Sequence, residues 1–600
     1  MTPSKLLTQT PTTRSGPGPA GSVRASAQPL WAWVAVSIPV ILFAGVWQYY
    51  AVNVPKWDDH ALRAYLYFFD QETTFSGKVY QLFRQHNEHR IVYDRLIATL
   101  DYWLFGKFSY VHLMVAGNMS LVGLLAVFST VLLRQGKSLL YALPVALLLF
   151  NLSHWENMFW GMAALQNFSV VWWVILTVYL LSYQHHWALA VSTAVLATLT
   201  SGNGLLVWPI GAVLLLLANP ASRPSPGAAA TRRPGRLLLG WVFVALVVIA
   251  LYFIGFEKPA GNPPERGSLT DLLKGWLAFT GAAAEALPAS SPLSTSIRLG
   301  GLMLLATLGA IGWGLARYRL PIGAALQRLV RPATAGSDRV IPSIDLFFWG
   351  SAAFVLGTAA IVAWTRTGFG IDLIITSRYK IYSLLLLALL YTYALAILPQ
   401  RSGQWIRVAG IAGSLLLAWL SVNAYLDETI WWRQWMLTSQ FNWTYGTSKP
   451  VGRLDDVTKK YTTPAPAFYD TNPTVLYQAG QPPVVPVTVN QTGDDFTIEN
   501  TTLPVQDRRD SRSFVVARSN ERVYLIPTRQ HQQAGLKARF WPFSPFTTGF
   551  TAMRGDVRLD AGVYQLFILS VAPDGQLTLH PTGKSVSSAG ESAAALKKNW

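Results

Sequence analysis

Long apolar runs separated by short polar stretches fill the first two thirds of the chain. A run of about 20 apolar residues is long enough to cross the hydrocarbon core of a bilayer as an α-helix. Eleven runs fit or approach this length, and those that meet near residues 185–186 and 201–204 are short. Together they predict a polytopic membrane helix bundle. The predicted spans are 30–50, 112–133, 138–152, 168–181, 187–199, 205–218, 237–256, 297–316, 345–364, 381–398 and 406–426.

The composition fits a chain that lies largely in lipid. Hydrophobic residues make up 51% of the sequence and charged residues 13%, with a mean hydropathy of +0.30. Ordinary soluble domains carry roughly 25% charged residues, so soluble enzymes and fibrous proteins are excluded. The chain has no Cys, which excludes disulfides, thiolate nucleophiles and Cys-ligated metals. The first run is longer than the roughly 7 to 15 apolar residues of a signal peptide, so we interpret it as an uncleaved span.

Charge predicts the orientation of the bundle. With a cytoplasmic N-terminus, the loops on that side carry 16 Lys and Arg against one acid, Asp338, whereas the opposite loops carry 12 basic and 13 acidic residues. This asymmetry follows the positive-inside rule. It predicts an extracytoplasmic C-terminal region. It also accounts for nearly all of the net charge of +18 without a nucleic-acid partner.

The composition divides the chain into three predicted parts. Residues 1–29 are rich in Ser, Thr, Pro and Gly and predict a disordered cytoplasmic tail, which precedes a membrane domain at 30–426. Residues 427–600 contain alternating segments and turn signals, which predict an extracytoplasmic, mostly-β, sandwich-like domain. This domain either packs on the membrane part or binds carbohydrate, with Phe540-Trp541-Pro542-Phe543 as the candidate aromatic platform.

The first predicted outer loop, 51–111, is patterned as helix. Apolar side chains recur at helical spacing along two stretches of it. We therefore expect two amphipathic helices that lie in the outer membrane–water interface. The patterned residues are Trp57, Ala61, Leu62, Tyr65 and Phe69 in the first stretch, and Tyr93, Leu96, Leu100 and Leu104 in the second.

Candidate chemistry begins directly after the first span, at Asp58 and Asp59. Paired carboxylates can supply a general base for a hydroxyl, or half of a site for a divalent cation such as Mg²⁺ or Mn²⁺. Adjacent helical residues point about 100° apart, so only one of the pair need face a site, and we favour Asp59 as the base. The alternative is a solvated helix N-terminus, where capping and the macrodipole favour Asp.

Further polar clusters fall on the same predicted outer side. Singly, such groups can be interfacial anchors, and Arg90 with Asp94 can form a plain i,i+4 salt bridge. Their convergence on one face of the bundle favours a shared site. The clusters are Glu88-His89-Arg90, His154-Trp155-Glu156-Asn157 with Gln166, Ser201-Gly202-Asn203-Gly204, and Arg366 with Asp372 and Ser377-Arg378-Tyr379.

This arrangement resembles the GT-C superfamily of integral-membrane glycosyltransferases. The resemblance rests on the acidic pair after the first span, the long helical first loop, eleven spans and an outer C-terminal domain. The stretches Asn87-Glu88-His89-Arg90, Ser201-Gly202-Asn203-Gly204 and Ser377-Arg378-Tyr379 are similar to those of poorly characterised bacterial members. The chain departs from the oligosaccharyltransferase branch, because Trp431-Trp432 is followed by Arg433 and no Trp-Trp-Asp motif occurs.

The resemblance implies a bacterial inner-membrane enzyme of cell-envelope synthesis that moves a sugar from a polyprenyl phosphate to a glycan, lipid or protein acceptor. The chemistry of the residues agrees, because such a transfer needs a base for the acceptor hydroxyl and a cation for the departing phosphate. We expect a single displacement with inversion. The base is assigned to Asp58 or Asp59, the phosphate site to Arg378, Arg366 and Tyr379, the sugar or acceptor site to Glu88, His89, Arg90, Glu156, Gln166 and Asn203, and any metal to Asp58, Asp59, Glu88 or His89.

Three other interpretations remain open. A transporter or flippase of lipid-linked glycans is the main alternative, although such folds often show paired halves and polar groups at the midplane. A membrane-anchored carbohydrate-binding protein would not need eleven spans. An O-antigen ligase would be expected to use the loop 257–296, which contains no His.

Overall fold

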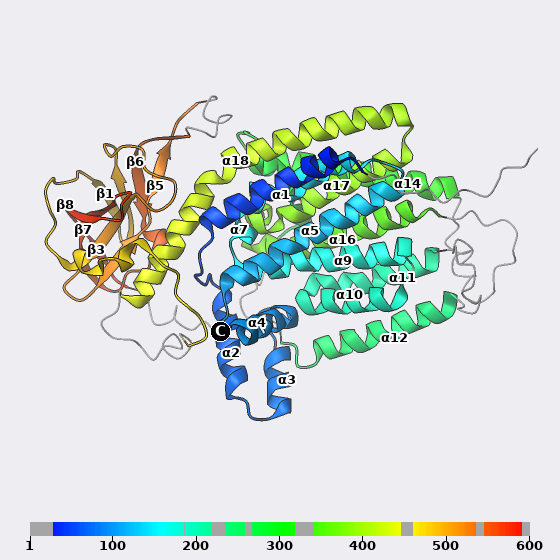
Figure 1. Cartoon of the computed structure of the whole chain (residues 1–600), viewed down its shortest axis with the longest axis horizontal. Coiled ribbons are helices and arrows are strands. Elements are labelled where there is room, and N and C mark those ends of the chain that lie inside the picture. Colours follow the sequence, from blue (N-terminus) through cyan, green and yellow to red (C-terminus); the bar gives the residue numbers. More distant parts are fainter. Residues whose placement is uncertain are drawn as a thin grey trace, which may run out of the picture.

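The structure is a computed structural model. It describes residues 28–184, 186–218, 234–257, 267–318, 341–445, 460–535 and 545–590. The predicted tail at 1–29, apart from its last two residues, and the aromatic run at 540–543 lie outside this part of the chain. The described chain is mainly helical and ends in a region of β-strands (Figure 1).

The prediction of a membrane helix bundle is confirmed. Within the described residues, nine helical segments are long and apolar enough to cross a membrane. The predicted spans 187–199 and 205–218 form shorter apolar helices, Trp187–Thr200 and Gly202–Leu217. The bundle helices are α1 (Leu30–Tyr50), α5 (Tyr110–Arg134), α6 (Leu143–Leu149), α9 (Ser169–Tyr179), α10 (Trp187–Thr200), α11 (Val207–Leu217), α12 (Pro234–Phe253), α13 (Leu269–Thr280), α14 (Pro292–Tyr318), α16 (Ser343–Arg366), α17 (Lys380–Ile397) and α18 (Gln400–Thr444).

Short helical turns join these helices at the ends of the bundle. The turn between α10 and α11 depends on two residues. Ser201 has an extended backbone that ends α10. Gly204 packs against α10 so closely that a Cβ on residue 204 would lie 2.0 Å from the carbonyl oxygen of Ala197. The turns used below are η2 (Leu152–His154), α7 (Trp155–Met158), α8 (Gly161–Ala163), η3 (Ala164–Phe168), η5 (Gly202–Leu206), η8 (Thr367–Phe369), η9 (Ile371–Ile375), η10 (Ser377–Tyr379) and η13 (Arg554–Asp556). The others are η1 (Leu139–Ala142), η4 (Leu180–Gln184), η7 (Ala282–Ala286), η11 (Phe468–Asp470) and η12 (Pro473–Tyr477).

Three short helices lie between α1 and α5, beside one end of the bundle (Figure 1). Two of them, α2 (Asp59–Gln71) and α4 (Val92–Phe105), cover the stretches where helices were expected. The third, α3 (Phe75–Phe83), was not predicted, and it begins where the Thr74 hydroxyl accepts the Gly77 N–H at 3.0 Å. Many of their apolar side chains are exposed, including Phe75, Val79, Tyr80, Phe83, Leu96, Leu100, Trp103, Leu104 and Phe105.

Helix α18 links the bundle to the β-strands. Its 45 residues span about 68 Å, roughly twice the 30 Å of a bilayer core, so the helix continues well past the predicted span at 406–426. Figure 1 shows it running along the bundle and ending among the strands. The last turns of α18 therefore pack against the C-terminal strands.

The C-terminal strands form two antiparallel four-stranded sheets, as the predicted sandwich requires, with strand orders β1-β2-β6-β5 and β4-β3-β7-β8. We call residues 484–590, as far as they are described, the β region. An apolar core that includes Ile498, Val515 and Ile568 lies between the sheets. The strands are β1 (Thr488–Thr492), β2 (Asp495–Asn500), β3 (Ser513–Arg518), β4 (Val523–Ile526), β5 (Arg529–Gln532), β6 (Phe546–Met553), β7 (Gly562–Val571) and β8 (Leu577–Ser588).

Strands β3 and β4 of the second sheet are buried on both faces, which explains why they are almost continuously apolar. The other face of this sheet packs Phe514 and Leu569 against Phe441 of α18. The free edge of β4 is covered as well, because the side chain of Asn442 exchanges two hydrogen bonds of 2.8 and 2.9 Å with the Leu525 main chain. The helix thus takes the place of a neighbouring layer and a neighbouring strand.

Substitution of Leu569 tests this packing. Leu569→Ala removes a fully buried side chain at the contact with α18, and we expect it to lower the stability of the β region by about 2–5 kcal/mol. The matched control is Val563→Ala on the same strand, where the side chain is 67% exposed and the effect should stay within about 0.5 kcal/mol. The loss of stability of each purified variant relative to the wild type is measured by thermal unfolding, with proteolytic cleavage of the β region as the signal. Equal losses would contradict the packing.

Candidate active site

Five segments that are far apart in the sequence meet at the end of the bundle beside the β region. They are 51–59, 86–89, 153–162, 201–204 and 366–379. Cross-contacts join them in pairs: Asp59 to Met162, His89 to Gly202, Glu88 to Arg366, and Glu156 to Arg378. The polar clusters predicted to share one side of the bundle are therefore close together.

Asp59 connects segment 51–59 to segment 153–162. It is completely buried, its Oδ2 accepts the Lys56 N–H at 3.0 Å, and its Oδ1 accepts the Met162 N–H at 2.8 Å. Burial raises the pKa of Asp59 to about 7. Both of its oxygens are occupied by main-chain donors, which leaves Asp59 poorly placed to accept a proton from a substrate.

Asp58 occupies a different environment from its neighbour. Its side chain is 36% exposed, and its Oδ1 lies 3.6 Å from Nε2 of His86. Burial raises the pKa of Asp58, but the hydrogen bond and charge of His86, together with Arg378 and His89, outweigh it, so the pKa lies below its usual value. Asp58 is therefore an ionised, accessible carboxylate at neutral pH.

The backbone just before Asp58 is strained. Trp57 has a φ of +37°, a conformation that a bulky residue rarely adopts. Such strain persists only where the surroundings hold it, and it is concentrated at functional sites. The ring of Trp57 lies edge-on to the ring of Trp160, with 5.5 Å between the ring centroids.

A tight turn presents the second group of candidates. His86 and His89 exchange two main-chain hydrogen bonds of 2.9 Å, and Asn87 between them has a φ of +48°. The turn brings Glu88 into an ion pair with Arg366. His86, which the sequence analysis did not select, contacts Asp58 more directly than its neighbours do.

His89 is held as a neutral donor. Its Nδ1 accepts the Gly202 N–H at 3.2 Å, so the proton belongs on Nε2, which faces Glu88 at 3.8 Å. Burial lowers the pKa of His89 to about 4, which agrees with the neutral form. Gly202 suits this contact, because a Cβ at this position would lie 3.1 Å from Nδ1 and the imidazole would have to shift by a few tenths of an ångström.

Arg378 carries an unsatisfied donor. Its Nε lies 3.4 Å from Oε1 of Glu156, and this buried nitrogen has no hydrogen-bond partner among the described residues. The guanidinium also lies over Trp160, 5.6 Å from the ring centroid. Buried donors are nearly always satisfied in native proteins, so this Nε, which is ion-paired with Glu156 but not hydrogen-bonded within the described chain, has room for an acceptor.

Main-chain contacts hold Arg378 in place. The Ser377 hydroxyl donates to the Ser153 carbonyl at 2.7 Å and accepts the Glu156 N–H at 3.2 Å, while the Asn157 side chain donates to the Arg378 carbonyl at 3.0 Å. Turns η10 and α7 are thereby joined. The guanidinium of Arg378 faces Glu156 and Trp160.

Lys56 is a site residue that the sequence analysis missed. It is 2% exposed, and its ammonium lies 3.7, 4.3 and 3.3 Å from the ring centroids of Trp57, Trp432 and Trp435. Burial lowers its pKa to about 7, and Glu156 opposes this shift. The only sequence signal for Lys56 was its position next to Trp57 and the acidic pair. Its spacing in the sequence could not predict contacts with Trp432 and Trp435, which lie far along the chain.

Four other predicted residues make no hydrogen bond or ion pair with Asp58 in the part of the chain that the structure describes. Arg90 donates to the carbonyls of Phe83, Tyr252 and Ile254, and the carboxylate oxygens of Asp94 have no hydrogen-bond partner there. Asn203 donates to the Tyr382 hydroxyl at 2.7 Å, and Tyr379 packs on Phe279 with ring centroids 5.4 Å apart. Gln166 lies on the π-helical turn η3, where its buried amide nitrogen has no hydrogen-bond partner among the described residues.

The metal ligands considered from sequence do not assemble. Among the described residues, no three His, Asp or Glu side chains are grouped closely enough to hold a metal ion. Asp59 is engaged by main-chain amides, and Glu88 is engaged by Arg366. A cation at this site would need additional ligands from a substrate.

Comparison of the chain with known protein families, curated proteins and solved structures finds no significant match. The chemistry of the site therefore follows from its own groups. These are an ionised carboxylate beside a His, a guanidinium whose buried Nε has no hydrogen-bond partner among the described residues, and a second guanidinium paired with Glu88. Such a set can bind an anion and remove a proton from a neighbouring hydroxyl.

The raised pKa of Asp59 gives a pH-dependent stability. The folded protein holds this proton more tightly than the unfolded chain, so ionisation of Asp59 lowers the free energy of unfolding as the pH rises from about 4 to about 7. Asp59→Asn lacks this contribution. We expect the stability advantage of the wild type over Asp59→Asn to shrink between about pH 4 and pH 7 in thermal unfolding. A constant difference would contradict the assignment.

Proposed function

We propose that the protein is a membrane glycosyltransferase that moves a sugar from a polyprenyl-phosphate donor to an acceptor hydroxyl. The observation that carries this proposal is the buried Nε of Arg378, which is paired with Glu156 but makes no hydrogen bond to any described residue, in the same cluster as the accessible carboxylate of Asp58. A phosphate oxygen would satisfy that donor. A hydroxyl bound near the same phosphate would be within reach of the carboxylate.

The proposed reaction is a single displacement with inversion. The acceptor oxygen forms a bond to the anomeric carbon while the bond from that carbon to the phosphate oxygen breaks, and the bonding electron pair leaves with the phosphate. Asp58 takes the proton of the acceptor hydroxyl. Arg378 stabilises the charge that develops on the departing phosphate, because a guanidinium is always charged and can bind two of its oxygens.

The remaining groups of the cluster fit the sugar. Neutral His89 offers an N–H donor on Nε2, and Glu88 beside it offers acceptor oxygens. Arg366 is a second phosphate ligand if it exchanges its pair with Glu88 for a substrate anion. We retain Glu156 as the residue that orients Arg378.

A lipid-linked substrate suits the surroundings of this cluster. Helices α3 and α4 expose aromatic and aliphatic side chains beside the same end of the bundle (Figure 1), where they can enter the membrane surface. With the charge asymmetry of the loops, this end is the extracytoplasmic side of a bacterial inner membrane. A transporter of lipid-linked glycans is less favoured, because the cluster lies at one end of the bundle and not at its middle.

Asp58→Asn tests the proposed base. An amide cannot take the proton, so we expect the release of polyprenyl phosphate from a panel of polyprenyl-phosphate sugars to fall about 100-fold or more. Asp70→Asn on the same helix, α2, is the matched control and should leave turnover unchanged, since Asp70 pairs with Lys460 away from the cluster. Unchanged thermal unfolding of both variants verifies the fold. Near-normal turnover of Asp58→Asn would overturn the assignment.

Arg378→Lys tests the phosphate contact. A Lys keeps the charge but loses the two-pronged geometry, so we expect kcat/KM for the donor to fall about tenfold to a hundredfold, equivalent to about 1.5–3 kcal/mol. The matched control is Arg401→Lys, an exposed position at the start of α18 at the far end of the bundle. Wild-type kinetics for the Arg378→Lys enzyme would show that this residue only anchors the helix end.

A further inference from the structure

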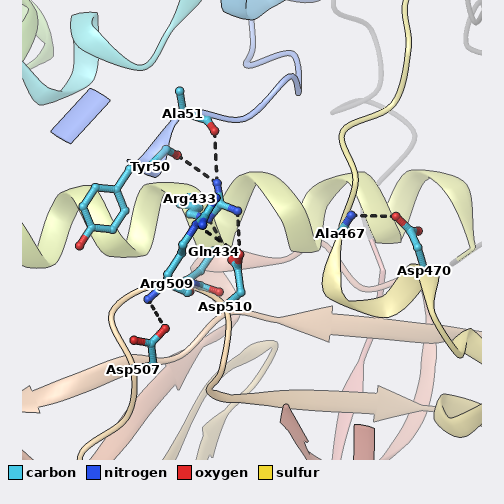
Figure 2. A network of polar contacts seen from close by, with 9 residues as sticks. All are labelled: Tyr50, Ala51, Arg433, Gln434, Ala467, Asp470, Asp507, Arg509 and Asp510. Carbon is cyan, nitrogen blue, oxygen red and sulfur yellow. Dashed lines mark hydrogen bonds and ion pairs between the residues drawn. The ribbon is translucent and has the colours of Figure 1, made fainter. Parts of the chain in front are cut away.

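Arg433 of α18 joins the β region to the chain that leads into the site. Its Nη1 donates to the carbonyls of Tyr50 and Ala51 at 3.4 and 3.2 Å, and its Nε and Nη2 donate to the two oxygens of Asp510 at 2.9 and 2.8 Å. Figure 2 shows the guanidinium between the end of α1 and the loop of the β region that carries Asp510. Gln434 adds a hydrogen bond to the Arg509 carbonyl. The contact is specific, because a two-pronged pair fixes both distance and orientation.

A second connection runs through the tryptophans around Lys56. Trp435 donates from Nε1 to the Asp556 carbonyl of η13, in the β region, at 3.0 Å. The same ring is the closest of the three that enclose the Lys56 ammonium, with 3.3 Å between that nitrogen and the ring centroid. Lys56 also contacts the ring of Trp57, the strained residue that precedes Asp58. Cation–π contacts are strongest where water is excluded, as it is around this 2% exposed side chain.

These two connections act on one short segment. Residues 50–51 begin it, and Lys56 and Trp57 lie at its end, directly before Asp58. A left-handed Trp is stable only when its surroundings determine its conformation. The ring of Trp57 contacts Trp160 and Lys56, and Lys56 is in turn enclosed by Trp432 and Trp435 of α18. Helix α18 is itself held by Asp510 and Asp556.

We propose that the β region is a positioning element of the site, which holds residues 50–58 through Arg433 and the tryptophan-enclosed Lys56 so that Asp58 faces His86. Arg433 and Lys56 are positioning residues, since they act through the segment and not on a substrate. The coupling between the β region and the segment stands on the contacts alone. Its consequence for turnover rests on the proposed function of Asp58.

Hydrogen exchange of the full-length protein in lipid nanodiscs tests the coupling without any substrate. Asp510→Asn removes the charge that Arg433 holds, and we expect the amides of residues 50–58 to exchange about tenfold faster or more, although they are remote in sequence. Asp495→Asn, an exposed Asp of β2, is the matched control and should not change them. Unchanged exchange at 50–58 in Asp510→Asn would overturn the proposal.

Lys56 variants keep the proposal testable if Asp510→Asn does not fold. Lys56→Met fills a similar volume without charge and should speed exchange at residues 50–58, whereas Lys56→Arg keeps a cation among the rings and should restore protection. Equal exchange in the two variants would contradict a role for the cation.

Kinetics then separate positioning from folding and from the proposed chemistry. Asp510→Asn should lower kcat for polyprenyl phosphate release about tenfold with donor KM unchanged, and the double variant with Asp58→Asn should be no slower than Asp58→Asn alone. Additive losses would place Asp510 outside this route. If the wild type releases no polyprenyl phosphate, the proposed function fails while the exchange result still decides the coupling.

Discussion

The candidate site depends on the two main-chain hydrogen bonds that the buried carboxylate of Asp59 accepts. Asp59 accepts the N–H of Lys56 in its own segment and the N–H of Met162 in segment 153–162. A buried polar group is costly unless it is hydrogen-bonded, so this pair of bonds fixes the distance between the two segments. Asp58, one position earlier, faces His86. Asp59 thus holds two segments of the site together, and Asp58 is the accessible carboxylate that we propose as the base.

The long helix α18 provides the second constraint. At one end it belongs to the bundle, and at the other it supplies Phe441 to the core of the second sheet and Asn442 to the edge of β4. Because β3 and β4 are buried on both faces, the β region packs on the helix as well as being connected to it by the chain. Contacts along the middle of α18, at Arg433 and Trp435, can then act on the segment after α1.

The sequence predicted elements whose signal is local. Apolar runs predicted the membrane helices, helical spacing marked α2 and α4, and alternation with turn signals marked the C-terminal strands. Length was the weak point: the runs at 187–199 and 205–218 form short helices around a sharp turn, and α18 continues past its apolar run. Continuous burial of β3 could not be foreseen, because the covering layer is a helix from another part of the chain.

Site residues were harder to assign than elements because residue type does not reveal direction. Adjacent Asp58 and Asp59 differ only in which way they point, and the order of preference taken from sequence is the reverse of the one that the geometry favours. Arg90 donates to main-chain carbonyls near helix ends, and no local sequence pattern predicts such partners. Lys56 was missed because its partners Trp432 and Trp435 lie on the last helix. Clusters were foreseeable, whereas the partners within them were not.

The most direct test of the account is the position of a bound donor. A structure of the full chain in lipid nanodiscs with a polyprenyl-phosphate sugar and no acceptor would locate it. The account predicts the phosphate within hydrogen-bond distance of Nε of Arg378, with the sugar between that phosphate and Asp58. A headgroup bound elsewhere, with Arg378 still facing only Glu156, would contradict it.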